Sequence, residues 1–177
     1  MNKYYLDGVL VVEGIQDVGF ISTFITTKFF ITNGYDISEE KIDFLTRVSL
    51  VNRVVVLTDN DEAGLKISNV IKSKIQGAFV VKTREIYRKN TKKRGVAETE
   101  REAIIESLSV FLQEDRGQLK KVNYELNKII SLSENPSKAK MDIIQDYRLL
   151  NGNIKYLEKQ LQMLGISKEE LQQKYGN

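Results

Sequence analysis

Residues 53–64 read Arg-Val-Val-Val-Leu-Thr-Asp-Asn-Asp-Glu-Ala-Gly, and this stretch decides the fold. Its β-branched apolar start is typical of a buried strand, and Asp59 and Asp61 follow where that strand ends. Earlier in the chain, Val11-Val12-Glu13-Gly14 has the same form, an apolar run that closes on an acid and a glycine. Open α/β sheets carry their chemistry at the carboxyl ends of strands. We therefore expect Glu13, Asp59 and Asp61 to meet at one edge of a sheet.

Strand and helix patterns alternate up to about residue 112. We expect strands at residues 9–13, 29–31, 53–57 and 78–81. The helices expected between and after them cover residues 18–25, a segment capped by Ser38, a segment after Gly64, and one that carries Ile104, Leu108, Phe111 and Leu112. Parallel strands require crossovers of this length. The pattern predicts an α/β domain over residues 1–117 with a mostly parallel, four-stranded sheet.

The strand signal disappears after Gly117. Residues 119–129 have apolar positions at helical spacing, and Asn135-Pro136 is typical of a helix start. Ser167, followed three residues later by Glu170, forms a capping box for a last helix. We expect residues 118–177 to be a separate, all-helical region.

The amino-acid composition excludes several kinds of active site. The chain has 177 residues, 41% of them hydrophobic, and contains neither cysteine nor histidine. This excludes disulfides, thiolate metal sites and every catalytic triad or zinc site that needs an imidazole. Because no apolar run approaches a membrane span and the N-terminus does not resemble a signal peptide, we expect a cytoplasmic protein without membrane contact.

Positive charge is concentrated in residues 82–94. This segment holds seven basic residues against one acid, although the whole chain has a net charge of only +3. Such a local excess favours a partner that carries phosphates. The alternative is a solvated basic loop without a partner.

The acids at the strand ends are candidates for metal ligands. Asp59 and Asp61 are close enough in sequence to repel each other when both are ionised, and a divalent ion would remove that repulsion. Mg²⁺ prefers oxygen ligands and is commonly held by one or two carboxylates together with substrate phosphate. We expect one or two Mg²⁺ ions, with Mn²⁺ as a substitute, held by Glu13, Asp59 and Asp61. A single aspartate after a strand is otherwise often a helix N-cap.

These motifs resemble a known family. Glu-Gly after a first strand and Asp-x-Asp before a glycine resemble the Toprim domain of topoisomerases, primases, OLD-type nucleases and small ribonucleases. Within that group, three further segments are similar to ribonuclease M5, the endonuclease that matures 5S ribosomal RNA. They are Thr32-Asn33-Gly34, Lys93-Arg94-Gly95-Val96 and the tail from Gly152 to Leu171. The resemblance covers residues 8 to about 106 and, more weakly, 148–171.

The resemblance implies Mg²⁺-dependent hydrolysis of a phosphodiester in precursor 5S ribosomal RNA. Asp59 and Asp61 would hold metal, and Glu13 would be a further ligand or the general acid or base. The edge of the site would include Gly14, Asp17, Asn33, Gly34 and Glu98. The residues expected to bind RNA are Arg88, Lys89, Lys92, Lys93, Arg94, Arg148 and Lys155. The implied partner is the ribosomal protein that binds 5S RNA, and a monomer is favoured.

The sequence departs from the family pattern at several positions. Ile15-Gln16-Asp17 stands where the family has Lys-Asp-Asp, Asn60 replaces a proline, and Gly95-Val96-Ala97 replaces Gly-Val-Glu with Glu98 displaced by one position. These departures motivate one alternative, a catalytically silent RNA-binding Toprim protein. A second alternative is a Toprim nuclease or primase-like module that keeps the same acids and acts on DNA. A receiver domain with acidic strand ends would need a lysine after a later strand, and Lys82 fits that role poorly.

Overall fold

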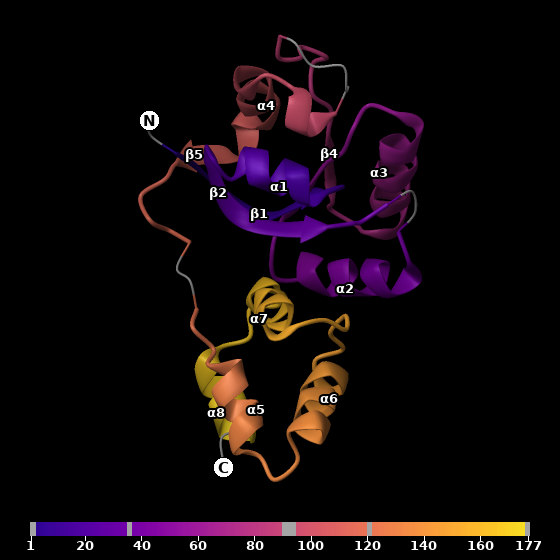
Figure 1. The fold of residues 1–177 in the computed structure, drawn as a ribbon. Helices are drawn as coiled ribbons and strands as arrows, with labels where there is room; N and C mark the ends of the chain where they lie inside the picture. Colours follow the sequence, from indigo (N-terminus) through magenta and orange to yellow (C-terminus); the bar gives the residue numbers. More distant parts are fainter. Residues whose placement is uncertain (1–2, 35–36, 90–94, 120–121, 176–177) are drawn as a thin grey trace. The chain divides into compact units, whose positions relative to one another are not determined.

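The computed structural model describes residues 3–34, 37–89, 95–119 and 122–175. The chain divides into two compact units, Met1–Leu119 and Lys120–Asn177. The first unit contains the sheet, and the second contains helices α5 to α8 (Figure 1).

Four strands of the first unit lie parallel in the order β2-β1-β3-β4. They are β1 (Tyr4–Val12), β2 (Ile25–Ile31), β3 (Val54–Leu57) and β4 (Phe79–Val81). All four run in the same direction, so their carboxyl ends lie along one edge of the sheet. The α/β fold with a mostly parallel sheet is thereby confirmed.

A fifth strand, β5 (Leu112–Glu114), joins the sheet antiparallel to the start of β1. Strand β1 pairs with β5 through Tyr4 to Leu6 and with β3 through Val9 to Val11. Gly8 lies between these two pairings with φ 149°, and a Cβ there would stand 2.5 Å from the carbonyl oxygen of Arg53. Glycine is needed here because the backbone of β1 meets the next strand too closely for a side chain.

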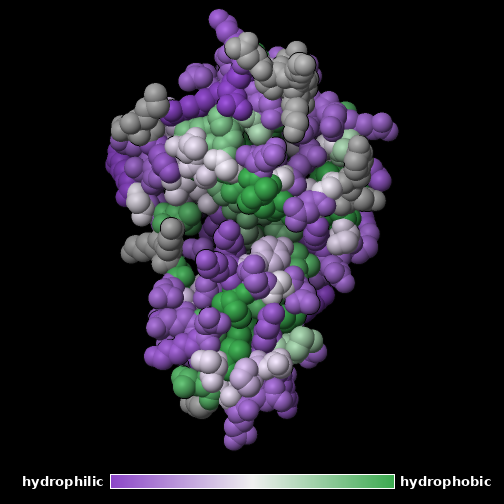
Figure 2. Space-filling model, in the orientation of Figure 1, coloured by the Kyte–Doolittle hydropathy of each residue, from purple (hydrophilic) through white to green (hydrophobic). Residues whose placement is uncertain are grey.

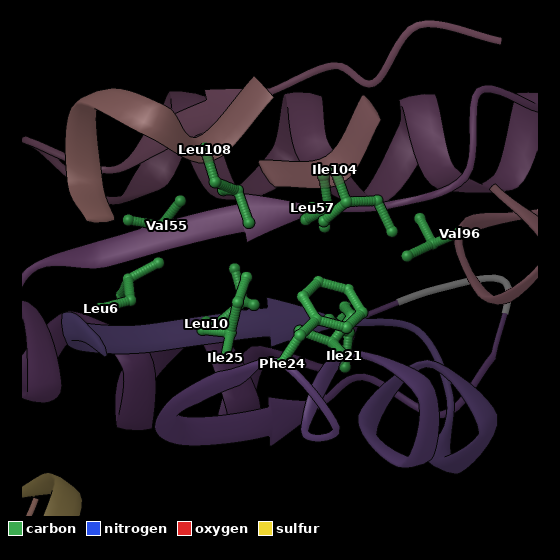
Figure 3. Close-up of a cluster of buried hydrophobic side chains, with 11 residues drawn as sticks. Leu6, Leu10, Ile21, Phe24, Ile25, Val55, Leu57, Val96, Ile104 and Leu108 are labelled. Carbon is green, nitrogen blue, oxygen red and sulfur yellow. The ribbon is translucent and has the colours of Figure 1, made fainter. Parts of the chain in front are cut away.

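Helices cover both faces of the sheet. They are α1 (Ile15–Ile21), α2 (Glu39–Ser49), α3 (Glu62–Lys74) and α4 (Arg101–Leu108), with short 3₁₀ turns at Val96–Glu98 and Ser109–Phe111. Ile21 at the end of α1, together with Ile104 and Leu108 of α4, packs against Leu10 and Leu57 of the sheet (Figure 3). Phe44 of α2 stacks on Phe30 of β2 at a ring distance of 5.7 Å. Because side chains alternate along a strand, β1 is buried by helices on both sides.

Several element boundaries differ from those predicted. Strand β1 begins at Tyr4 rather than residue 9, and helix α1 covers Ile15–Ile21 rather than residues 18–25. The helix expected to reach Leu112 ends at Leu108, and its last apolar positions belong to a 3₁₀ turn and to β5. Long-range pairing with β1 outweighs the local helical spacing of these residues.

The second unit consists of short helices with polar caps. They are α5 (Leu126–Leu132), α6 (Pro136–Asp146), α7 (Ile154–Met163) and α8 (Lys168–Tyr175). Asn135 caps α6 by accepting from the amide of Lys138, and Ser167 accepts from the amide of Glu170 at 3.0 Å. Both helix starts were predicted correctly. The helix expected across residues 119–129 is shorter than predicted, since it begins only at Leu126.

Hydrophilic side chains cover most of the face seen in Figure 2, with apolar residues gathered in separate patches. No helix within the described parts of the chain is long and apolar enough to cross a membrane.

Candidate active site

A hydrogen bond joins the two acidic motifs. The main-chain N–H of Asp59 donates to Oε1 of Glu13 at 2.7 Å. Glu13 directly follows β1, Asp59 lies two residues after the end of β3, and these two strands are neighbours in the sheet. The carboxyl edge of the sheet therefore brings together two acids that lie far apart in the sequence, as predicted.

The turn at Gly95–Glu98 fixes the side chain of Asp59. The amide of Val96 donates to Oδ1 of Asp59 at 2.6 Å. A Cβ at Gly95 would stand 2.9 and 3.0 Å from the two carboxylate oxygens of Asp59 and 3.0 Å from Oε2 of Glu98. Glu98 and Asp59 thus face the same point on the backbone of Gly95, and a side chain there would displace their carboxylates.

Asp61 forms the N-cap of α3. Its Oδ1 accepts a hydrogen bond from the amide of Gly64 at 2.9 Å. A Cβ at Gly64 would stand 2.2 Å from the carbonyl oxygen of Asp59 and 2.6 Å from Oε1 of Glu13. The hydroxyl of Thr58 donates to the carbonyl oxygen of Gly64 at 3.0 Å. The loop between β3 and α3 is therefore packed tightly around both motifs.

Asp17 and Asn33, two of the other residues predicted for the site edge, contact the first acidic motif. Oδ2 of Asp17 in α1 accepts from the amide of Gly14 at 2.9 Å, and the Asp17 side chain is buried. The amide of Asn33 donates to the carbonyl oxygen of Glu13 at 3.0 Å. Asn33 and Gly34 both have positive φ, 55° and 129°, so the chain turns sharply away after β2.

Burial and mutual repulsion alter the acidity of these groups. Burial, together with the nearby charges of Asp59, Asp61 and Asp17, raises the pKa of Glu13 from 4.5 to about 7, against the lowering effect of the Asp59 amide. Burial also raises the pKa of Asp59 and of Asp17, and the hydrogen bonds that they accept from main-chain amides only partly oppose this. Ionising all of these acids at the same time is therefore unfavourable in the folded chain.

The donor set fits a hard divalent cation, but its side chains are not already gathered around one. Among the described residues, no group of three or more acidic side chains is arranged so that it could hold a metal ion. The hydrogen bonds to Glu13, Asp59 and Asp61 each engage one carboxylate oxygen. Each carboxylate thus keeps a second oxygen for a cation, and Mg²⁺ suits such a site because it keeps part of its shell as water or substrate oxygen.

The residues predicted to bind RNA are spread over both units. Arg88 and Lys89 follow β4 and are exposed, whereas Lys92, Lys93 and Arg94 lie outside the described residues. The guanidinium of Arg88 donates to the carbonyl oxygen of Ala97 at 2.5 Å. Two more of the predicted residues, Arg148 after α6 and Lys155 in the first turn of α7, belong to the second unit.

Two features of the site were missed from the sequence. The Val96 amide is a main-chain donor, which no side-chain motif reveals. The contact of Arg88 with Ala97 depends on the turn that precedes α4, and the only local signal for it was the glycine at residue 95.

Comparison with known families agrees with this geometry. Residues 10–93 match the family described as Toprim-like. The chain contains a Toprim domain. This Toprim domain covers both acidic motifs, while the turn that binds Asp59 lies just beyond the matched residues.

Curated relatives extend the similarity over nearly the whole chain. The protein named "Ribonuclease M5" from Mycoplasma genitalium is 26% identical over 94% of this chain and 93% of its own length. The protein of the same name from Clostridium acetobutylicum is 28% identical over 92% of this chain and 89% of its own. That from Mesoplasma florum is 32% identical over 56% of this chain and 59% of its own. The similarity thus includes the helical region that follows the Toprim domain.

Proposed function

We propose that this chain is a Mg²⁺-dependent endoribonuclease that hydrolyses phosphodiester bonds in precursor 5S ribosomal RNA. The observation that carries the proposal is the Glu13–Asp59 pair at the carboxyl edge of a Toprim sheet. The name shared by the curated relatives supports ribonuclease activity, and the resemblance of the sequence to that family supports 5S RNA as the substrate.

The three acids have two roles in the proposed reaction. Asp59 and Asp61 would hold the metal. Both follow β3, and their side chains are fixed by the main-chain amides of Val96 and Gly64. Glu13, with a pKa of about 7, can hold or release a proton near neutral pH, which suits a general acid or base. Mg²⁺ bound here would polarise the scissile phosphate and lower the pKa of an attacking water. Water is the natural nucleophile because the chain has neither cysteine nor histidine.

The test is cleavage of a precursor 5S transcript by the purified full-length chain. Reactions with Mg²⁺, with Mn²⁺ and with EDTA are compared, with and without the ribosomal protein that binds 5S RNA. We expect discrete cuts with Mg²⁺ and none with EDTA. DNA of the same sequence, single-stranded and duplex, is the matched substrate control.

Two outcomes would contradict the proposal. Cleavage of DNA in preference to RNA would favour a DNA-acting Toprim nuclease. Tight RNA binding without cleavage under any condition would favour a silent RNA-binding protein, consistent with the altered residues Ile15, Gln16 and Ala97.

A further inference from the structure

The turn at Gly95–Glu98 is held from three sides. Val96 places its side chain in the core beside Leu57 and Ile104 (Figure 3), while its amide binds Asp59. Directly after the turn, the hydroxyl of Thr99 donates back to the carbonyl oxygen of Gly95 at 2.9 Å. A third support comes from Arg88. The position of the Val96 amide therefore depends partly on a side chain outside the turn.

Arg88 contacts both the turn and helix α1. Its side chain donates to the carbonyl oxygen of Ala97 at 2.5 Å, and its main-chain amide donates to the carbonyl oxygen of Glu98 at 2.8 Å. The guanidinium lies 4.7 Å from the ring centre of Phe20, within the range of a cation–π interaction. These contacts tie the turn to the helix that follows Glu13.

The backbone on either side reinforces this arrangement. The amide of Glu100 donates to the carbonyl oxygen of Ile86 at 2.8 Å, and Tyr87 pairs antiparallel with Thr99. Residues 86–88 and 98–100 therefore lie side by side, so a shift of Arg88 is transmitted to the turn. The amide of Ala97 also donates to Asp17, so the same turn contacts a second acid of the site.

We propose that Arg88 is a positioning residue for Asp59, acting through the turn at Gly95–Glu98, rather than a contact for the RNA backbone. One nitrogen of this guanidinium is bound to Ala97 and its face lies against the ring of Phe20, so its position is set by contacts within the protein. The inference rests on the proposed function for its catalytic consequence, but the structural link between Arg88 and the Val96 amide can be measured without RNA.

The test compares three variants of the full chain. Arg88→Gln removes the charge and the cation–π contact, and Arg88→Lys restores the charge and one donor. Arg116→Gln is the matched control, because Arg116 is an exposed arginine that pairs with Glu114 at the surface. For each variant we would measure the single-turnover rate at saturating RNA, the RNA affinity at several salt concentrations, and the Val96 amide proton shift in the metal-free protein.

We expect Arg88→Gln to lower the single-turnover rate about ten- to hundredfold, the scale expected when a reacting group is slightly misplaced. RNA affinity and its salt dependence should match those of Arg116→Gln. The Val96 amide proton, bound to a carboxylate in the wild type, should move upfield in Arg88→Gln, and Arg88→Lys should recover part of both the rate and the shift.

Two results would overturn the inference. One is an unchanged saturating rate with weaker, less salt-dependent RNA binding, which would make Arg88 a phosphate contact. The other is an unchanged Val96 amide in Arg88→Gln. If the wild-type chain cleaves no RNA, the proposed function fails, while the amide shift still decides whether Arg88 positions the turn.

Discussion

The amide of Asp59 donates to the carboxylate of Glu13 across 46 residues of sequence, and this bond connects the ends of two neighbouring strands. It also explains why Gly64 has no side chain, since a Cβ there would collide with both partners. The contact fixes the geometry of the site, while burial and the nearby charges of Asp59 and Asp61 raise the pKa of Glu13, which the Asp59 amide only partly opposes.

The raised pKa of Glu13 predicts that Glu13→Gln is more stable than the wild type at high pH. The pKa of Glu13 is raised from 4.5 to about 7 on folding, so the folded chain binds this proton more tightly than the unfolded chain. The resulting stabilisation is present below pH 4.5 and is lost as the pH rises through 7. Glutamine keeps the acceptor for the Asp59 amide but does not ionise. After a discount for partial exposure, the metal-free variant should be about 1 kcal/mol more stable at pH 8.

Thermal unfolding at pH 5 and pH 8 measures this effect. A gain of about 1 kcal/mol corresponds to a rise in Tm of about 3 °C for a chain of this size. Added Mg²⁺ should raise the Tm of the wild type more than that of the variant, because it binds the folded site. An equal Tm difference at both pH values would contradict the shifted pKa of Glu13.

Asp59→Asn should abolish cleavage and leave the fold and RNA binding nearly intact. The amide oxygen of asparagine can still accept from Val96, so the turn at Gly95–Glu98 keeps its anchor. The negative charge needed to hold a cation is lost. Cleavage and filter-binding assays measure the two effects separately. Asp43→Asn is the matched control, because Asp43 lies in α2, where it pairs with Arg47 at 3.3 Å. Wild-type activity in Asp59→Asn would remove Asp59 from the metal site.

The sequence predicted the central sheet better than its margins. Residues 54–57 and 9–12 are apolar without interruption, which is typical of parallel strands buried on both faces. The start of β1 was missed because Asp7 and Gly8 interrupt its apolar pattern. Strand β5 was missed because it depends on pairing with Tyr4 to Leu6, more than one hundred residues away. Local periodicity carries no information about such a partner.

The acids of the site were predictable because their residue types and their places at strand ends are visible in the sequence. Their mutual contacts were not, since the donors to Glu13, Asp59 and Asp61 are all main-chain amides. Every residue except proline has such an amide, and only the folded backbone decides which amide meets which carboxylate.

Gly64→Ala should destabilise the chain and impair the site. Its Cβ would stand 2.2 Å from the carbonyl oxygen of Asp59, a contact that the backbone can relieve only by moving. We expect a loss of about 2–3 kcal/mol in the free energy of unfolding. Gly19→Ala in α1 is the matched control, because a Cβ there meets nothing within 4 Å and alanine favours a helix. Urea unfolding of both variants measures the difference. Equal stability of the two would mean that the Gly64 contact is relieved without cost.

The basic run at residues 82–94 leads to a prediction about how RNA affinity depends on salt concentration. If Lys92, Lys93 and Arg94 each neutralise one phosphate of single-stranded RNA, changing all three to glutamine should reduce the slope of log affinity against log salt by about 2. Changing Lys72, Lys74 and Arg116 to glutamine removes the same charge from sites outside this run and should alter the slope much less. The cleavage rate at saturating RNA should stay near that of the wild type in both triple variants, since neither changes an acid of the site. A slope that is the same in both would mean that residues 92–94 are solvated rather than bound to RNA.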